Sequence, residues 1–125
     1  MPNTTPIPRR DPQLLKGVLP MLILALLDRQ ESYGYEIVTS LEEEGLEDIA
    51  TGTVYPLLTR LQREGLLTYR LIASESGPAR KYYSPTAAGL VHLKQSRAAW
   101  ATLNVVVDRI TAPTATPANS KGRES

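Results

Sequence analysis

The sequence of 125 residues contains no cysteine and a single histidine. The lack of cysteine excludes disulfide bonds, thiolate zinc sites and cysteine nucleophiles, and it suits a reducing compartment, so we expect a cytoplasmic protein. The lone histidine, His92, has no cysteine or acidic ligand cluster near it. We therefore expect His92 to be a surface residue, and we expect neither a metal site nor a bound cofactor.

The sequence also lacks a long apolar run and a strong net charge. Its most apolar stretch, residues 14–27, is only fourteen residues long and contains Lys16, Gly17 and Pro20, so it is too short and too interrupted to cross a bilayer. Neither end resembles a secretory signal. The formal net charge is +1, so total charge gives no argument for nucleic-acid binding.

Catalytic motifs are missing as well. Serine, histidine and aspartate all occur, but no nucleophile elbow, phosphate-binding loop or paired-carboxylate spacing accompanies them. We therefore expect no enzymatic activity.

Charge and proline are distributed unevenly. Residues 1–13 contain four prolines and show no apolar periodicity, and residues 111–125 show none either. These two segments are therefore predicted to be a disordered N-terminal arm and a disordered tail. Residues 33–50 carry six acidic and no basic side chains, whereas residues 51–85 carry five basic and two acidic ones. Such a separation suits a protein in which one face meets a polyanion and another avoids it.

Three helices are predicted in the first half of the chain. Residues 14–27 indicate a buried helix with Pro20 near its start or at a kink. Its main apolar stripe comprises Leu22, Ile23, Leu26 and Leu27. Met21 and Leu24 lie off this stripe. Apolar spacing predicts further helices over 33–44 and 51–64. The expected signals at their ends are Gly45 and Gly65 as stops, Thr51 or Thr53 as an N-cap, and Pro56 in a first turn.

The pattern then changes to that of a hairpin. Residues 66–74 and 80–84 are predicted strands, joined by a turn over 75–79. A last helix follows over 86–110, with Thr86 or Ser84 as its cap. This order predicts a mainly helical (α+β) fold, a winged helix-turn-helix domain over 14–85 with a two-stranded wing.

The second helix of such a pair enters the major groove of DNA. Its outward positions carry hydroxyls, cations and a glycine that lets backbones approach, and they are Thr51, Gly52, Thr53, Tyr55, Thr59, Arg60 and Arg63. We expect base contacts from Thr53, Thr59 and Arg60. The wing adds cations near a tip at residues 76–78, which suit phosphates; its predicted DNA-binding residues are Arg70, Gly77, Arg80 and Lys81. For Arg9 and Arg10 a solvated tail is favoured over a groove contact.

The last helix predicts a partner. An apolar seam repeats every three or four residues, which a monomer would leave exposed to water; its members are Leu93, Ser96, Trp100, Leu103, Val107 and Ile110. We expect residues 86–110 to form a homodimer interface together with Leu22 and Leu26, with two recognition helices about 34 Å apart.

Several motifs resemble those of the PadR-type transcriptional regulators. They are ILALL at 23–27, YGYEI at 33–37, GTVYPLLTRLQREGLL at 52–67 and RKYYSPTAAG at 80–89. The resemblance implies a winged helix that binds double-stranded DNA, a homodimer, and a repressor released by a small molecule or another signal. The single helix after the wing resembles the short-tailed branch of the family.

The resemblance also implies roles for single residues. Tyr55 would contact a phosphate of the DNA; packing of its ring between helices is an equal alternative. Tyr83 would have a packing role and help to anchor the wing. Trp100 resembles a tryptophan that short-tailed members use to sandwich flat aromatic compounds, although dimer core is the favoured interpretation. Asn104 beside it would orient such an effector or fix helix register.

A second functional class stays open. A winged helix can serve as a protein-docking module without an operator. The acidic helix within residues 36–48 would then be its binding face. The basic recognition helix and wing favour DNA over this alternative.

Overall fold

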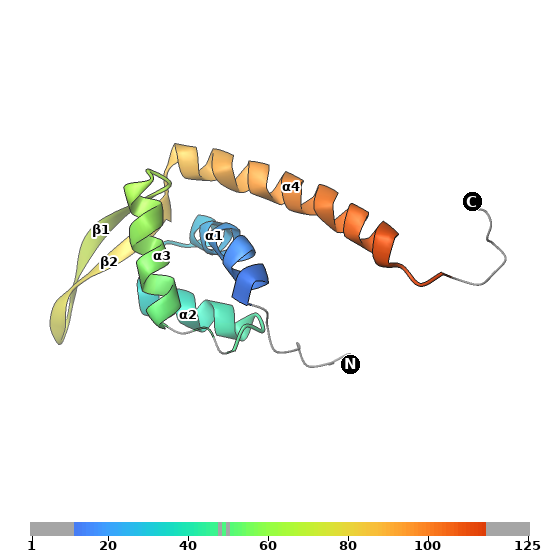
Figure 1. The fold of residues 1–125 in the computed structure, drawn as a ribbon. Helices are drawn as coiled ribbons and strands as arrows, with labels where there is room; N and C mark the ends of the chain where they lie inside the picture. Colours follow the sequence, from blue (N-terminus) through green and yellow to red (C-terminus); the bar gives the residue numbers. More distant parts are fainter. Residues whose placement is uncertain (1–11, 48, 50, 115–125) are drawn as a thin grey trace. The chain divides into compact units, whose positions relative to one another are not determined.

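A computed structural model describes residues 12–47, 49 and 51–114 of the chain. The predicted arm with Arg9 and Arg10, and the tail from residue 115 onward, lie outside this range. The elements, in chain order, are α1 (Pro12–Arg29), α2 (Gly34–Glu43), α3 (Thr51–Arg63), β1 (Leu67–Ser74), β2 (Gly77–Pro85) and α4 (Ala87–Thr111) (Figure 1). This order confirms the predicted winged helix, mainly helical with a two-stranded sheet.

The chain divides into two compact units at residue 95. The first holds α1, α2, α3, the hairpin and the start of α4. The second holds the remainder of α4. Among the described residues, no helix is both long enough and apolar enough to traverse a membrane.

α1 buries a broader surface than its sequence stripe predicts. Leu24 is fully buried, so its predicted position off the stripe is wrong, and Leu22 and Leu26 are only partly buried. The reason is that α1 contacts both α2 and β2. Pro20 lies inside the helix and not near its start.

The C-terminal ends of α2 and α3 follow the predicted signals, whereas Thr51 and Thr53, the predicted N-caps of α3, both lie inside that helix. Gly45 and Gly65 adopt φ values of 114° and 81°, in the left-handed region that favours glycine, and they confirm the predicted stops. The Tyr33 N–H donates to the Glu36 carboxylate at 3.3 Å and so satisfies a donor at the start of α2. Pro56 lies inside α3, so its predicted place in a first turn is wrong.

The hairpin turn is shorter than predicted. Only Glu75 and Ser76 separate the antiparallel strands, and Gly77 and Pro78 already belong to β2. The predicted turn over 75–79 is therefore wrong. Pro78 can lie in β2 because both strands of a two-stranded sheet are edge strands, where a residue without an N–H donor is tolerated. The pairing is irregular between Ile72 and Ser74, close to this turn.

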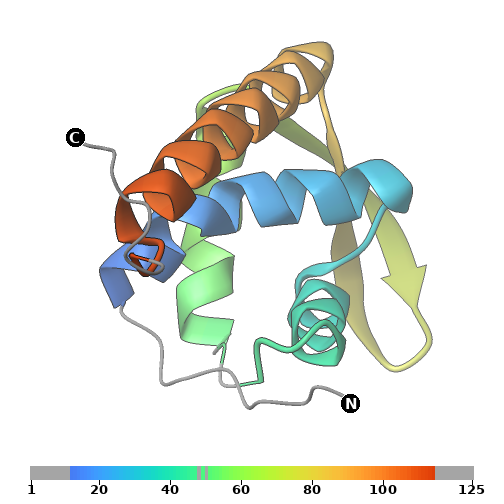
Figure 2. The same ribbon diagram turned by 90° about the vertical axis from the view of Figure 1, so that its right-hand side faces the viewer.

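One apolar core holds the first unit together. α1 runs across the direction of α3 (Figure 2), and α2 packs against α3. Each helix contributes leucine, isoleucine or valine, the hairpin contributes Leu67 and Tyr83, and α4 contributes Leu93. The side chains exposed by less than 2% are Leu19, Ile23, Leu24, Ile37, Val54, Leu58 and Leu61.

The start of α4 is fastened to the turn between α3 and β1. The Thr86 hydroxyl accepts from the Gly89 N–H at 3.0 Å, which confirms Thr86 as the cap, and donates to the Gly65 carbonyl at 2.6 Å. The Thr86 N–H donates to the Leu66 carbonyl at 3.1 Å. Gly89 is buried there, and a Cβ at this position would overlap the same Leu66 carbonyl oxygen.

This close approach predicts a specific loss of stability. Gly89→Ala should lower the free energy of unfolding by about 1–3 kcal/mol, because backbone atoms must move to admit the methyl group. Urea unfolding followed by circular dichroism measures the change. Gly17→Ala is the matched control: no atom lies within 4 Å of its Cβ position, so it should stabilise the helix by up to about 1 kcal/mol. Equal effects of the two substitutions would contradict the packing described here.

Candidate nucleic-acid interface

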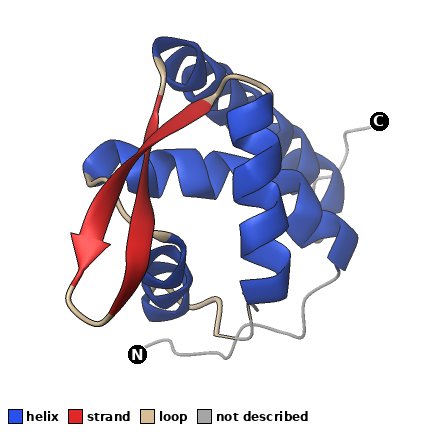
Figure 3. Ribbon diagram, turned by 90° about the vertical axis from the view of Figure 1, so that its left-hand side faces the viewer, coloured by secondary structure: helices blue, strands red, loops and turns tan. Residues whose placement is uncertain are grey.

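Burial of one side of α3 determines which of its side chains remain exposed. Val54, Leu58 and Leu61 are buried in the core, and the hairpin lies beside the helix (Figure 3). All the positions of α3 that are predicted to contact DNA are exposed; they are Thr51, Gly52, Thr53, Tyr55, Thr59, Arg60 and Arg63. The helix therefore presents hydroxyls and two cations to solvent.

The exposed groups of α3 differ in whether they already form contacts within the chain. The Thr59 hydroxyl donates to the Tyr55 carbonyl at 3.3 Å but can still accept a hydrogen bond. Arg60 Nε lies 3.5 Å from Glu64 Oε2. Both side chains are exposed, so this ion pair holds the Arg60 side chain only weakly. Around Gly52 there is open space, since no atom lies within 4 Å of its Cβ position.

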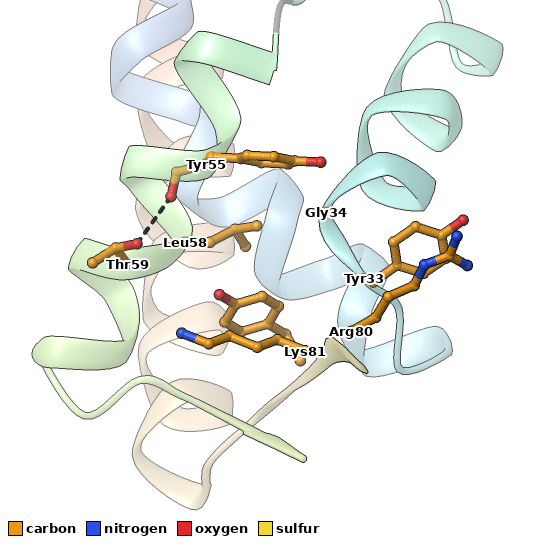
Figure 4. A pocket seen from close by; sticks show the side chains of 8 residues that line it. Tyr33, Gly34, Tyr55, Leu58, Thr59, Arg80 and Lys81 are labelled. Atoms are coloured by element: carbon orange, nitrogen blue, oxygen red, sulfur yellow. Dashed lines mark hydrogen bonds between the residues drawn. The ribbon is translucent and has the colours of Figure 1, made fainter. Parts of the chain in front are cut away.

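The two neighbouring cations of the wing rest on aromatic rings. The Arg80 guanidinium lies 4.5 Å from the centre of the Tyr33 ring, and Lys81 Nζ lies 4.6 Å from the centre of the Tyr69 ring. Successive strand residues point to opposite faces, so the two cations stand on either side of the hairpin (Figure 4). Contact with a ring restrains a cation without neutralising its charge.

Arg70, the third predicted cation of the wing, is held differently. Its guanidinium donates two hydrogen bonds to the Glu31 carboxylate, at 2.8 and 2.5 Å. The hydrogen bond from Arg70 lowers the pKa of Glu31 below its ordinary value. The pair is therefore ionised at neutral pH, and its contribution to stability is lost as the pH falls through the lowered folded-state pKa. The charge of Arg70 is balanced locally, unlike that of Arg80 or Lys81.

A cavity of about 300 Å³ lies between the recognition helix and the wing. Its lining is aromatic, cationic and hydroxylic, and it comprises Tyr33, Gly34, Tyr55, Leu58, Thr59, Arg80, Lys81 and Tyr83. Tyr83 is buried, in agreement with the packing role that the resemblance implied, and burial raises the pKa of its phenol.

Tyr55 both packs and remains exposed. Its side chain extends from α3 toward Gly34 on α2 (Figure 4), where a Cβ would overlap the ring. Tyr55 is nevertheless 46% exposed as a residue, so packing and a phosphate contact do not exclude one another. Gly34 lies within the YGYEI segment, but no spacing rule predicts its contact with a residue 21 positions away.

The predicted dimer residues fall into two groups. Four apolar residues in the second unit are exposed, by 42 to 76%; they are Trp100, Leu103, Val107 and Ile110. Asn104 is also exposed. Leu93 does not share this exposure: it is 7% exposed and packs in the core of its own chain, so it leaves no surface for a partner to cover. Leu22 and Leu26 pack partly against the same core.

His92 is exposed, as predicted. Within the described part of the chain, no group of three histidine, cysteine, aspartate or glutamate side chains could hold a metal ion.

The contact between Gly34 and Tyr55 generates a prediction. Gly34→Ala should destabilise the wild-type chain by about 1 kcal/mol or more, because the Tyr55 ring must move away. In a Tyr55→Ala background the same change should be neutral or stabilising, because the ring is gone and alanine favours helix. Urea unfolding of the four proteins yields the coupling energy. A coupling energy near zero would show that Gly34 does not set the position of the ring.

Comparison with known proteins agrees with this geometry. A model of the "Transcriptional regulator PadR-like family" matches residues 23–95. A PadR-like regulator structure from Bacillus cereus superposes with a TM-score of 0.72 at 40% identity, covering 80% of this chain and 97% of the other. A PadR family regulator from Eggerthella lenta gives a TM-score of 0.74 at 37% identity, covering 81% and 88%.

A longer protein is also similar. Transcriptional regulator YqjI of Escherichia coli is 32% identical over 83 residues, which is 65% of this chain but only 38% of that regulator. The family match spans the C-terminal part of α1, all of α2, α3 and the hairpin, and the start of α4. The chain therefore belongs to the PadR-like family of transcriptional regulators.

Proposed function

We propose that two copies of this chain bind a palindromic operator and repress transcription in the cytoplasm. The observation that carries the proposal is the exposed polar and cationic surface of α3, which lies next to a wing bearing Arg80 and Lys81. Hydroxyls and guanidinium groups on a groove-sized helix suit base edges, and cations beside it suit phosphates.

The residues divide into two roles in this proposal. Thr53, Thr59 and Arg60 contact base edges, while Arg80 and Lys81 contact phosphates. The remaining positions assist them: Gly52 allows close approach of the backbones, and the Tyr55 hydroxyl contacts a phosphate. Arg70 contributes less than the other wing cations, because Glu31 already neutralises it.

Dimerisation rests on the exposed apolar residues of α4. Trp100, Leu103 and Val107 follow one another at three- and four-residue spacing, and each is more than 40% exposed. Covering such a seam with its symmetry mate is favourable, and a twofold dimer places two recognition helices about one turn of DNA apart. We further propose that a signal releases the repressor; a flat aromatic effector held by Trp100 and Asn104 is one form of it.

The wing assignment predicts a change in salt dependence. Lys81→Ala and Arg80→Ala should each weaken binding to operator and to random duplex alike. Each lost phosphate contact should reduce the slope of log Kobs against log salt by about 0.9. Fluorescence anisotropy over a salt series measures both quantities. Arg70→Ala should change the slope less, and Lys94→Ala, at an exposed position of α4, should not change it.

Two outcomes would contradict the assignment. If neither wing substitution changes affinity or slope, the wing does not contact phosphates. If the wild-type dimer shows no preference for any genomic duplex over random DNA, it binds no operator, and a docking module on the acidic surface of α2 would explain the fold better.

The dimer is tested independently of DNA. Replacing Leu103 and Val107 together by lysine should convert the dimer to a monomer, because four buried charges would face each other across the seam. Sedimentation velocity at micromolar concentration measures the mass, and circular dichroism checks that helix content is kept. Lysine at exposed Ala101 and Val105 is the matched control. A monomeric wild-type protein, or a dimer unaffected by the paired change, would contradict this interface.

A further inference from the structure

The carboxylate of Glu31 lies on the connection between α1 and α2, outside the surfaces that the proposed function assigns to DNA. It accepts two hydrogen bonds from the guanidinium of Arg70 on β1, at 2.8 and 2.5 Å. In this pair the Arg70 side chain stays 66% exposed and the Glu31 side chain 29%. The carboxylate therefore balances the charge of a cation that a ligand in solution can still reach.

The register of the hairpin places Arg70 on the same face as Arg80. Arg70 pairs with Tyr82 across the sheet and Arg80 pairs with Ile72, and residues two positions apart on a strand point to the same side. The two arginines are thus offset by two residues, or about 7 Å along the strand direction. Because Arg80 is a proposed phosphate contact, Arg70 would extend the same row of phosphate contacts if its charge were free.

Other contacts keep the wing in place beside this pair. Ser32 and Tyr83 exchange two backbone hydrogen bonds, at 3.3 and 2.8 Å, and the centre of the Tyr33 ring lies 5.3 Å from that of the Tyr82 ring. An ion pair as exposed as Glu31–Arg70 contributes little to stability. The effect of Glu31 on the charge of the wing therefore outweighs its effect on the position of the wing.

We propose that Glu31 limits the affinity of the chain for duplex DNA by masking Arg70, an inference that rests on the proposed function. In the free chain the pair removes one cation from the row that meets phosphates. When a phosphate takes Arg70, the Glu31 carboxylate is left unpaired beside a polyanion, which is unfavourable. Phosphate contacts carry no direct sequence information, so the mask weakens binding to operator and to random duplex by the same factor.

Glu31→Gln tests the mask, because the carboxamide keeps the shape of the side chain and removes its charge. Binding to random duplex should tighten about threefold or more at about 0.1 M salt, and the slope of log Kobs against log salt should steepen by about 0.9. Fluorescence anisotropy over a salt series measures both quantities. In an Arg70→Gln background the same substitution should change neither. Glu44→Gln is the matched control: it removes another exposed ion pair, with Arg29 at 3.6 Å, and should leave the slope unchanged.

Three outcomes would overturn the mask. A gain in affinity that persists in the Arg70→Gln background would mean that Glu31 acts only by repelling the duplex. A loss of affinity in Glu31→Gln, with unchanged urea unfolding, would mean that the pair holds the wing in its DNA-binding position. Unchanged affinity and slope would mean that Glu31 does not limit binding.

Retention on a heparin column tests the mask without any duplex. Heparin is a polyanion, so the salt concentration that elutes the chain depends on its accessible cations. Glu31→Gln should elute at higher salt than wild type, and the difference should vanish in the Arg70→Gln background. Equal elution of wild type and Glu31→Gln would overturn the mask. A chain that binds no duplex would overturn the proposed function, whereas the heparin measurement would still decide whether Glu31 masks Arg70.

Discussion

The rotation of α3 about its own axis is the constraint on which the rest of the structure depends. Burial of Val54, Leu58 and Leu61 fixes that rotation, and a fully buried aliphatic side chain contributes about 1.5–3 kcal/mol. Turning the helix to bury its hydroxyls and arginines would lose this contribution and leave polar groups without partners. The surface offered to DNA is therefore a consequence of core packing.

The position of the wing depends on contacts of another kind. At one end, Thr86 and Gly89 tie the hairpin and α4 to the turn after α3. Along its length, the Glu31–Arg70 pair and the contact of Arg80 with the Tyr33 ring hold it against the helical part of the unit. The contact of Lys81 with the Tyr69 ring joins the two strands of the wing to each other. These contacts balance the charge of one cation and leave two available, which makes the wing both ordered and positive.

Local signals could be predicted from the sequence, and contacts across the fold could not. Gly45, Gly65 and Thr86 act through their own backbone neighbourhood, and each terminates or caps a helix as expected. The Glu31–Arg70 pair joins residues 39 positions apart, so no spacing rule could reveal it. Leu93 looked like part of a dimer seam because its spacing fits, but periodicity cannot tell the core of one chain from an interface between two chains.

The most direct test compares specificity with affinity. Wild type, Arg60→Ala and Lys81→Ala are titrated with an operator found by footprinting on genomic DNA and with random duplex of equal length, at one salt concentration. Arg60→Ala should reduce the ratio of operator to random affinity by about 1–3 kcal/mol in free energy, whereas Lys81→Ala should lower both affinities and keep the ratio. If the ratio survives in Arg60→Ala, or falls only in Lys81→Ala, the assignment of base reading to the exposed surface of α3 is contradicted.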